Sequence, residues 1–183
     1  VPTAGRTAEV AKEFVRQARL ILQGEPKANG MVLRGFAAKP QLPTFEQVYG
    51  LRSAAIAVYP MYKGLARLAG MTLVGKSQSL GEQIETLAGC WNDYDFFFLH
   101  FKYTDSTGED GAFDHKVKRI EELDRAIPKI EALKPDVLIA VDDEANSFVA
   151  QHYVGRDKPH ILYVSIDRPP AAYGYVDAPN VSG

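Results

Sequence analysis

Two clusters of acidic residues each follow directly on an apolar run of the sequence. Asp105 and Glu109 lie in the segment TDSTGEDG, which comes after the run FFFLHFKY. Asp142–Glu144 are consecutive acids after the run DVLIAV, and His152 follows eight residues after the last of them. If both runs are neighbouring parallel strands, the two clusters converge at one edge of a sheet. Converging carboxylates repel one another, and a divalent cation held by carboxylates and a neutral imidazole relieves that repulsion.

Helix capping accounts for the same acids equally well. Asp110 or Asp114 could cap the helix that follows them, and Asp143 could cap a later helical turn. Other reactive residue types favour structural roles. His100 lies inside an apolar run and is expected to pack, and Cys90 has no cysteine partner and no basic neighbourhood that would make it a nucleophile.

Two basic residues are candidates for binding an anion. Lys63 follows the apolar run SAAIAVYP at the start of an expected helix, and Arg34 ends the short run MVLR. A phosphate or carboxylate suits both, because a helix N-terminus favours anions and an arginine can bind them through two parallel hydrogen bonds. An ordinary role as surface cations is an equally good interpretation of each.

The elements that must position these residues alternate between strand and helix. Apolar periodicity predicts helices over 7–23, 61–70, 80–93 and 113–133, and strands over 31–36, 53–60, 94–103, 136–141 and 160–166. Thr7 and Ser79 are expected N-caps, and Pro128 is expected to kink or restart its helix. The alternation predicts an α/β fold, a mostly parallel sheet with helices on both faces. We expect one domain over 1–168 and a Pro/Gly-rich tail over 169–183, read as loop.

Composition excludes several classes of protein. The chain has 183 residues, a net charge of -2, 46% hydrophobic residues and one cysteine. This apolar fraction is typical of a globular core, and one cysteine excludes a disulfide scaffold or a Cys-rich zinc module. The near-neutral charge gives no basic footprint for nucleic acid, and no apolar run approaches the ~20 residues of a membrane span. No signal peptide is visible, so we expect a cytoplasmic protein.

The order of several segments resembles the cofactor-independent (2,3-bisphosphoglycerate-independent) phosphoglycerate mutases of the archaeal type, in the alkaline phosphatase superfamily. These segments include LPTFEQVYGL, AAIAVYPMYKGLARLAGM, YDFFFLHFKYTDSTGEDGAFDHKVKRIEELD and KPDVLIAVDDEANS. The resemblance runs roughly from residue 7 to residue 166 and implies part of an alkaline-phosphatase-like core. It also implies a glycolytic isomerase that interconverts 3-phosphoglycerate and 2-phosphoglycerate through a phosphoserine, with two divalent metals.

The resemblance implies roles for individual residues. Asp105 and Glu109 fall on the family's TDxxGHDG-like metal motif, with Glu109 in place of a histidine. Asp143 and Glu144 fall on its TGDHSTP-like motif, with Glu144 again in place of a histidine. His152 matches a later metal-binding histidine. Carboxylates in place of imidazoles give a more oxygen-rich site, which shifts the expected metal from Zn²⁺ toward Mn²⁺ or Mg²⁺.

The same resemblance places Lys63 at a catalytic position and Arg34 at a phosphate-facing one. It also implies that a further metal-binding aspartate and the phosphorylated serine come from a strand and helix ahead of the matching segment. No counterpart is visible in this sequence, which begins without Met, so the chain is expected to be the C-terminal portion of an enzyme. Two alternatives stay open: a non-catalytic metal- or phosphate-binding module, and a metallo-phosphohydrolase.

Overall fold

The structure is a computed structural model that describes residues 3–38 and 40–183, and of residues 142–144 it describes the backbone alone. The chain divides into two compact units, residues 1–42 and residues 43–183. The expected division into a domain over 1–168 and a tail stays a prediction.

The first unit contains the helix α1 (Arg6–Leu22). The helix begins one residue after Gly5, whose φ of 82° lies in the left-handed region, so Thr7 is inside the helix and the expectation of a Thr7 cap is wrong. Residues 31–36 form neither helix nor strand, which corrects the strand expected there. A strand needs a neighbouring strand to accept its backbone hydrogen bonds, and the described part of this unit provides none.

A three-stranded parallel sheet opens the second unit. Its strands are β1 (Ser53–Ala57), β2 (Thr72–Leu73) and β3 (Phe96–His100), in the order β2-β1-β3. The run SAAIA is apolar at nearly every position, and all five residues of β1 are buried, as expected for a central strand covered on both faces. The register pairs Ala57 with His100, so β1 and β3 end at the same edge of the sheet.

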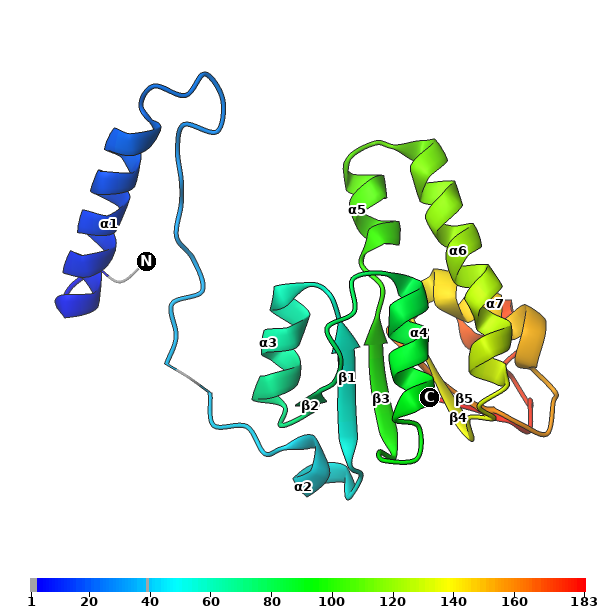
Figure 1. The fold of residues 1–183 in the computed structure, drawn as a ribbon. Coiled ribbons are helices and arrows are strands. Elements are labelled where there is room, and N and C mark those ends of the chain that lie inside the picture. Colours follow the sequence, from blue (N-terminus) through cyan, green and yellow to red (C-terminus); the bar gives the residue numbers. More distant parts are fainter. Residues whose placement is uncertain (1–2, 39) are drawn as a thin grey trace. The chain divides into compact units, whose positions relative to one another are not determined.

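Short helices follow and precede these strands (Figure 1). They are α2 (Phe45–Tyr49), α3 (Pro60–Leu68) and α4 (Leu80–Gly89). Ser79 caps α4 as expected, in a reciprocal capping box in which the Glu82 side chain accepts from the backbone of Ser79. Thr44 and Gln47 form the same motif at the start of α2. These caps satisfy backbone N–H groups that have no partner inside the helix.

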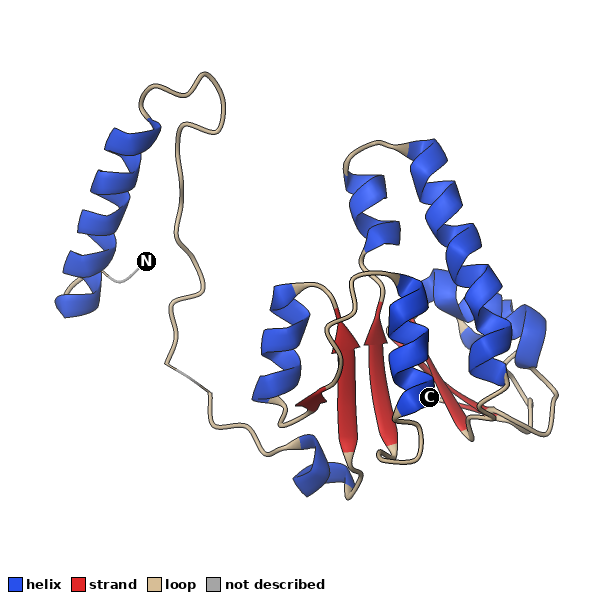
Figure 2. Ribbon diagram, in the orientation of Figure 1, coloured by secondary structure: helices blue, strands red, loops and turns tan. Residues whose placement is uncertain are grey.

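A second parallel sheet has the order β4-β5-β6 and uses the strands β4 (Val137–Val141), β5 (His160–Val164) and β6 (Val181–Ser182). Helix α7 (Asp142–Tyr153) connects β4 to β5 and begins ahead of Asp143, which was expected to cap a later helical turn. The 3-10 helix η1 (Pro170–Tyr173) precedes β6. Figure 2 shows the strands of the second unit with helices between them.

Residues 169–183, expected as loop, are part of the second core. Tyr173, Tyr175 and Asn180 are buried, and β6 pairs with β5. Tyr175 donates a hydrogen bond to Asn146 on α7, at 2.8 Å. The Pro and Gly content of residues 169–183 indicated a loop. Three buried aromatic and amide side chains hold the segment in place, and they form no periodic pattern from which the packing could be predicted.

Two helices follow β3. The first is α5 (Tyr103–Glu109), where a loop was expected, and the second is α6 (Phe113–Glu131). Pro128 lies within the last turn of α6, and the helix continues to Glu131 without restarting there; the kink expected at Pro128 stays a prediction. Proline has no backbone N–H, so it removes at most one hydrogen bond of the helix. Little of the helix follows Pro128, so little of it depends on the geometry there. Ala126 of α6 packs with Leu80 and Ile84 of α4 in a buried cluster.

The fold class matches the prediction: helices alternate with strands, and every strand pair is parallel. The strands form two separate hydrogen-bonded sheets, however, and β3 and β4 are not neighbours. In the part of the chain that the structure describes, no helix has the length and hydropathy needed to cross a membrane.

Candidate metal centre at the end of strand β3

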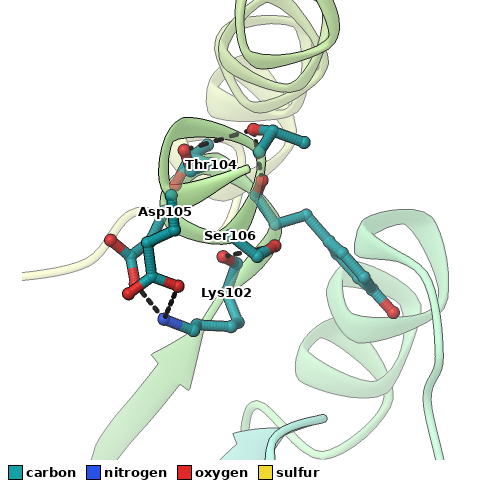
Figure 3. A network of polar contacts seen from close by, with 7 residues as sticks. Lys102, Thr104, Asp105 and Ser106 are labelled. Carbon is teal, nitrogen blue, oxygen red and sulfur yellow. Dashed lines mark hydrogen bonds and ion pairs between the residues drawn. The ribbon is translucent and has the colours of Figure 1, made fainter. Parts of the chain in front are cut away.

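Lys102 joins the first acidic cluster to the carboxyl end of β3. It stands two residues beyond His100, the last residue of the strand, and is the N-cap residue of α5. Its ammonium donates a short hydrogen bond to Asp105 Oδ2, and it lies 3.6 Å from Glu109 Oε2 (Figure 3). The Lys102 side chain is 19% exposed, whereas Asp105 and Glu109 are 61% and 66% exposed. A largely covered cation therefore holds two solvent-facing carboxylates.

The helical geometry of α5 explains why these acids meet. Asp105 and Glu109 are four residues apart, so they lie on one face of the helix one turn from each other. Lys102 precedes Asp105 by three residues and reaches the same face. Hydrogen bonding to Lys102 lowers the pKa of the Asp105 carboxyl, and the same bond raises the pKa of the Lys102 ammonium. Both groups are thus charged at neutral pH.

Aromatic and polar side chains lie beneath this cluster. The Lys102 ammonium lies 5.6 Å from the ring centroid of Tyr59, at the start of α3. The His100 ring stacks on Tyr62 with centroids 3.7 Å apart, and burial lowers the pKa of His100. Gln83 of α4 is fully buried and donates to the backbone carbonyl of His100 at 2.9 Å. His100 therefore packs as expected, and α4 fixes the end of β3.

The second acidic cluster follows β4, which belongs to the other sheet. The backbone of Asp142–Glu144 forms the first turn of α7, and the side chains of these residues lie outside the described part of the structure. β3 pairs with β1, and β4 pairs with β5, so the expectation that the two strands are neighbours in one sheet is wrong, and the convergence of the two clusters stays a prediction. A sequence of alternating elements does not show which strands are adjacent, because adjacency depends on long-range pairing.

His152 lies in the last turn of α7 with an exposed ring. Its Nδ1 is 2.9 Å from the carbonyl oxygen of Phe148, and the two rings stack with centroids 4.3 Å apart. A carbonyl only accepts, so Nδ1 carries the hydrogen and Nε2 of the neutral ring keeps its lone pair. Metal-binding histidines commonly show this arrangement, in which one nitrogen is fixed by a carbonyl and the other binds the metal.

The two basic candidates lie in different units. Lys63 is half-buried in the first turn of α3, just beyond the end of β1 and at the sheet edge where Lys102 follows β3. Arg34 is exposed in residues 1–42, outside helix and strand. The structure thus places Lys63 at the same strand edge as the first acidic cluster, and Arg34 belongs to a separately described part.

The capping interpretation of the acids is wrong for the residues named. The N-cap residue of α6 is Ala112, and no side chain caps this helix. Asp110 is the C-cap residue of α5, and Asp114 lies inside the first turn of α6. Helix α7 starts earlier than expected, so Asp143 is a helical residue and not a cap. Cys90 fits its expected inert role, because burial raises the pKa of its thiol.

Lys102 is the residue that sequence reasoning missed. The signal was present in the spacing Lys102, Asp105, Glu109, which is an i, i+3, i+7 pattern on one helical face. No helix was predicted over this segment, and so the helical spacing was not applied. Thr107 instead donates to the Tyr103 carbonyl at 2.7 Å, which is compatible with a helix.

The donor set at the end of β3 fits a hard divalent cation. Two carboxylates already gather around one positive charge, the Lys102 ammonium. Oxygen donors of this kind suit Mg²⁺ or Mn²⁺. No three or more His, Cys, Asp or Glu side chains come together as a complete ligand group within the described residues. Asp105 and Glu109 could therefore supply only part of a ligand set.

Comparison with known proteins gives concordant results. A model of the metalloenzyme superfamily matches residues 29–152. A protein of Thermotoga neapolitana named probable 2,3-bisphosphoglycerate-independent phosphoglycerate mutase is 51% identical over 140 residues, which are 76% of this chain and 35% of that protein. A protein of the same name from Thermotoga petrophila is 48% identical over 163 residues, 89% of this chain and 41% of the other.

A solved structure supports the fold. The PH0037 protein of Pyrococcus horikoshii superposes with a TM-score of 0.54 at 27% identity, over 72% of this chain and 39% of that one. This chain spans about two fifths of the length of the curated relatives that it matches. The family match covers both acidic clusters, Lys63 and His152. By sequence and fold, the chain belongs to the metalloenzyme superfamily, and its curated relatives carry the name of the mutase family that it resembles.

Proposed function

We propose that this chain supplies the metal- and phosphate-binding portion of a phosphoglycerate mutase. The reaction interconverts 3-phosphoglycerate and 2-phosphoglycerate through a phosphoserine, with two divalent metals, and the phosphorylated serine lies outside this chain. The observation that carries the proposal is the pair of carboxylates, Asp105 and Glu109, gathered on one cation at the carboxyl end of β3. Functional residues of α/β folds concentrate at this edge.

Metal ions, when bound, would offset the negative charge of a transferring phosphoryl group. Five residues are proposed to hold them: Asp105, Glu109, Asp143, Glu144 and His152. The oxygen-rich set favours Mn²⁺ or Mg²⁺ over Zn²⁺. The His152 Nε2 lone pair is compatible with this role.

Two cations of the chain are proposed to act on the substrate. Lys63 offsets charge from the first turn of α3, where the helix dipole adds to its effect. Arg34 binds the phosphate, for which the planar guanidinium offers two parallel donors. Both roles accord with a soluble phosphorylated substrate and a cytoplasmic location, which are parts of the same proposal.

A non-catalytic metal- or phosphate-binding module is the second candidate. It is favoured by the partial ligand set, because the side chains that the structure describes bring no three metal-binding groups together. A related phosphohydrolase, which needs no serine, is a third reading of the same residues.

The test combines thermal unfolding and turnover. The purified chain is melted with and without Mn²⁺ or Mg²⁺, and 3-phosphoglycerate conversion is followed with the same ions. A cation that binds the folded state alone raises the melting temperature, and Asp105→Ala is expected to abolish that rise. Asp157→Ala, at an exposed aspartate of the loop after α7, is the matched control.

Each result separates the candidates. A rise that 3-phosphoglycerate increases further supports the mutase portion, which is not expected to convert the substrate alone because the phosphorylated serine lies outside this chain. A rise with phosphate release supports the phosphohydrolase, and a rise that 3-phosphoglycerate leaves unchanged, without turnover, supports the non-catalytic module. No rise and no turnover contradict all three metal-dependent readings.

A further inference from the structure

We propose that Lys102 is an internal counter-cation of the Asp105/Glu109 pair, and that a divalent cation binds there only by displacing its ammonium. The inference rests on the proposed function in one respect, namely that these two carboxylates are metal ligands. It adds a positioning residue to that site and a reason for a weakened metal affinity.

The geometry makes Lys102 a competitor of the metal. Its ammonium bonds directly to Asp105 and is 3.6 Å from Glu109, so it occupies the space between the oxygens that a cation would contact. A metal ion near these oxygens would stand within a few ångströms of the ammonium. Two positive charges at that separation repel strongly, and the repulsion is least screened where the side chain is covered from solvent.

Lys102 also has a partner other than the two carboxylates. Its ammonium is 5.6 Å from the centroid of the Tyr59 ring, at a distance where an aromatic face attracts a cation. Most of the Lys102 side chain is covered. Tyr59 is therefore a partner already in contact with the ammonium, and it remains available when a metal ion takes the carboxylates.

Lys116 of α6 is a second cation near the segment. Its ammonium lies close to Gly108, since a Cβ built there would meet it at 2.9 Å, and its charge contributes to the lowered pKa of Asp105. Lys102 bonds directly to Asp105, whereas among the described residues Lys116 forms no ion pair with either carboxylate. Neutralising Lys116 should consequently raise metal affinity less than neutralising Lys102.

The test measures Mn²⁺ binding directly. The free ion is counted by electron paramagnetic resonance in titrations of the full chain and its variants. Lys102→Met keeps the length of the stem and removes the charge, and it is expected to tighten Mn²⁺ binding about tenfold. Lys102→Arg keeps the charge and is expected to bind as the parent does. Lys129→Met, at an exposed lysine of α6, is the matched control and should leave the affinity unchanged.

A double variant fixes the location of the ion. Adding Asp105→Asn to Lys102→Met should abolish the gain. Equal affinities of the parent and Lys102→Met overturn the proposal, and so does a gain that survives Asp105→Asn or the absence of measurable binding in every variant. If the gain is seen but 3-phosphoglycerate does not raise the melting temperature of the metal-loaded chain, the mutase proposal is overturned and the role of Lys102 stays intact.

Discussion

Asn180 offers a direct measure of how firmly the last residues of the chain are attached to the second sheet. Its side chain is 5% exposed and makes three hydrogen bonds. Nδ2 donates to the carbonyls of Tyr153 at 2.8 Å and Pro159 at 3.3 Å, and Oδ1 accepts from the N–H of Gly155 at 2.8 Å. Asn180→Ala removes all three and leaves the backbone bond from Ile161 to residue 180 in place.

The expected cost is about 2–3 kcal/mol of unfolding free energy. A net hydrogen bond contributes about 0.5–1.5 kcal/mol, and a buried group left without a partner costs more. The bond to Pro159 is long, and the Gly155 backbone is exposed and can bond to water instead, which keeps the sum below the upper limit. For a chain of this size, the loss corresponds to a fall in melting temperature of about 4–12 °C.

The assay is chemical unfolding followed by circular dichroism, with Asn92→Ala as the matched control. Asn92 is exposed in the turn after α4, and its replacement should change the stability by less than about 0.5 kcal/mol. If Asn180→Ala is as stable as Asn92→Ala, residues 169–183 do not pack as described. The reasoning from buried hydrogen bonds would then be refuted.

Three further predictions concern charged groups. The Arg52 guanidinium lowers the pKa of Asp95 from 3.8 to about 2. The pair therefore stabilises the fold above pH 3.8, and this stabilisation is lost as the pH falls through about 2. In urea unfolding, Asp95→Asn should be less stable than the parent at neutral pH, and the difference in unfolding free energy between the two should narrow as the pH falls across this range. Burial, with a hydrogen bond to Glu131, raises the pKa of Tyr153 from 10.0 to about 12. The stabilising effect of Tyr153 is therefore present below pH 10 and is lost as the pH rises toward 12. In a spectrophotometric titration of the tyrosines, the last one to ionise should be missing from Tyr153→Phe. Glu144→His should strengthen Zn²⁺ binding in a competition titration if residue 144 is a ligand position, and an unchanged Zn²⁺ affinity would contradict that assignment.

Local patterns in the sequence were sufficient to predict most of the helices and strands. Ser79 and the following apolar positions specify the start of α4, because the capping box needs only residues three apart. The run SAAIA has the unbroken apolar character of a strand buried on both faces, and β1 is buried throughout. Thr7 is not the N-cap residue, because Gly5, with its positive φ, takes that position and the helix begins directly after it.

The candidate site was predictable in its residue types and not in its arrangement. Asp105 and Glu109 were identified by their position after an apolar run, and the structure places them on one helical face. Lys102 was missed because its role depends on α5 being a helix and on α3 bringing Tyr59 toward it. For Asp143 and Glu144 the metal-binding role stays a prediction.

The sequence by itself determined the α/β class, the parallel strands, the Ser79 cap and the family, all of which depend on periodicity or on local motifs. Tertiary structure decided that β3 and β4 belong to different sheets, that residues 169–183 join the second core, and that Tyr59 lies near the Lys102 ammonium. These features arise from contacts between residues far apart in the chain or between helices and strands. No local pattern encodes them, because such contacts are selected by the packing free energy of the whole unit.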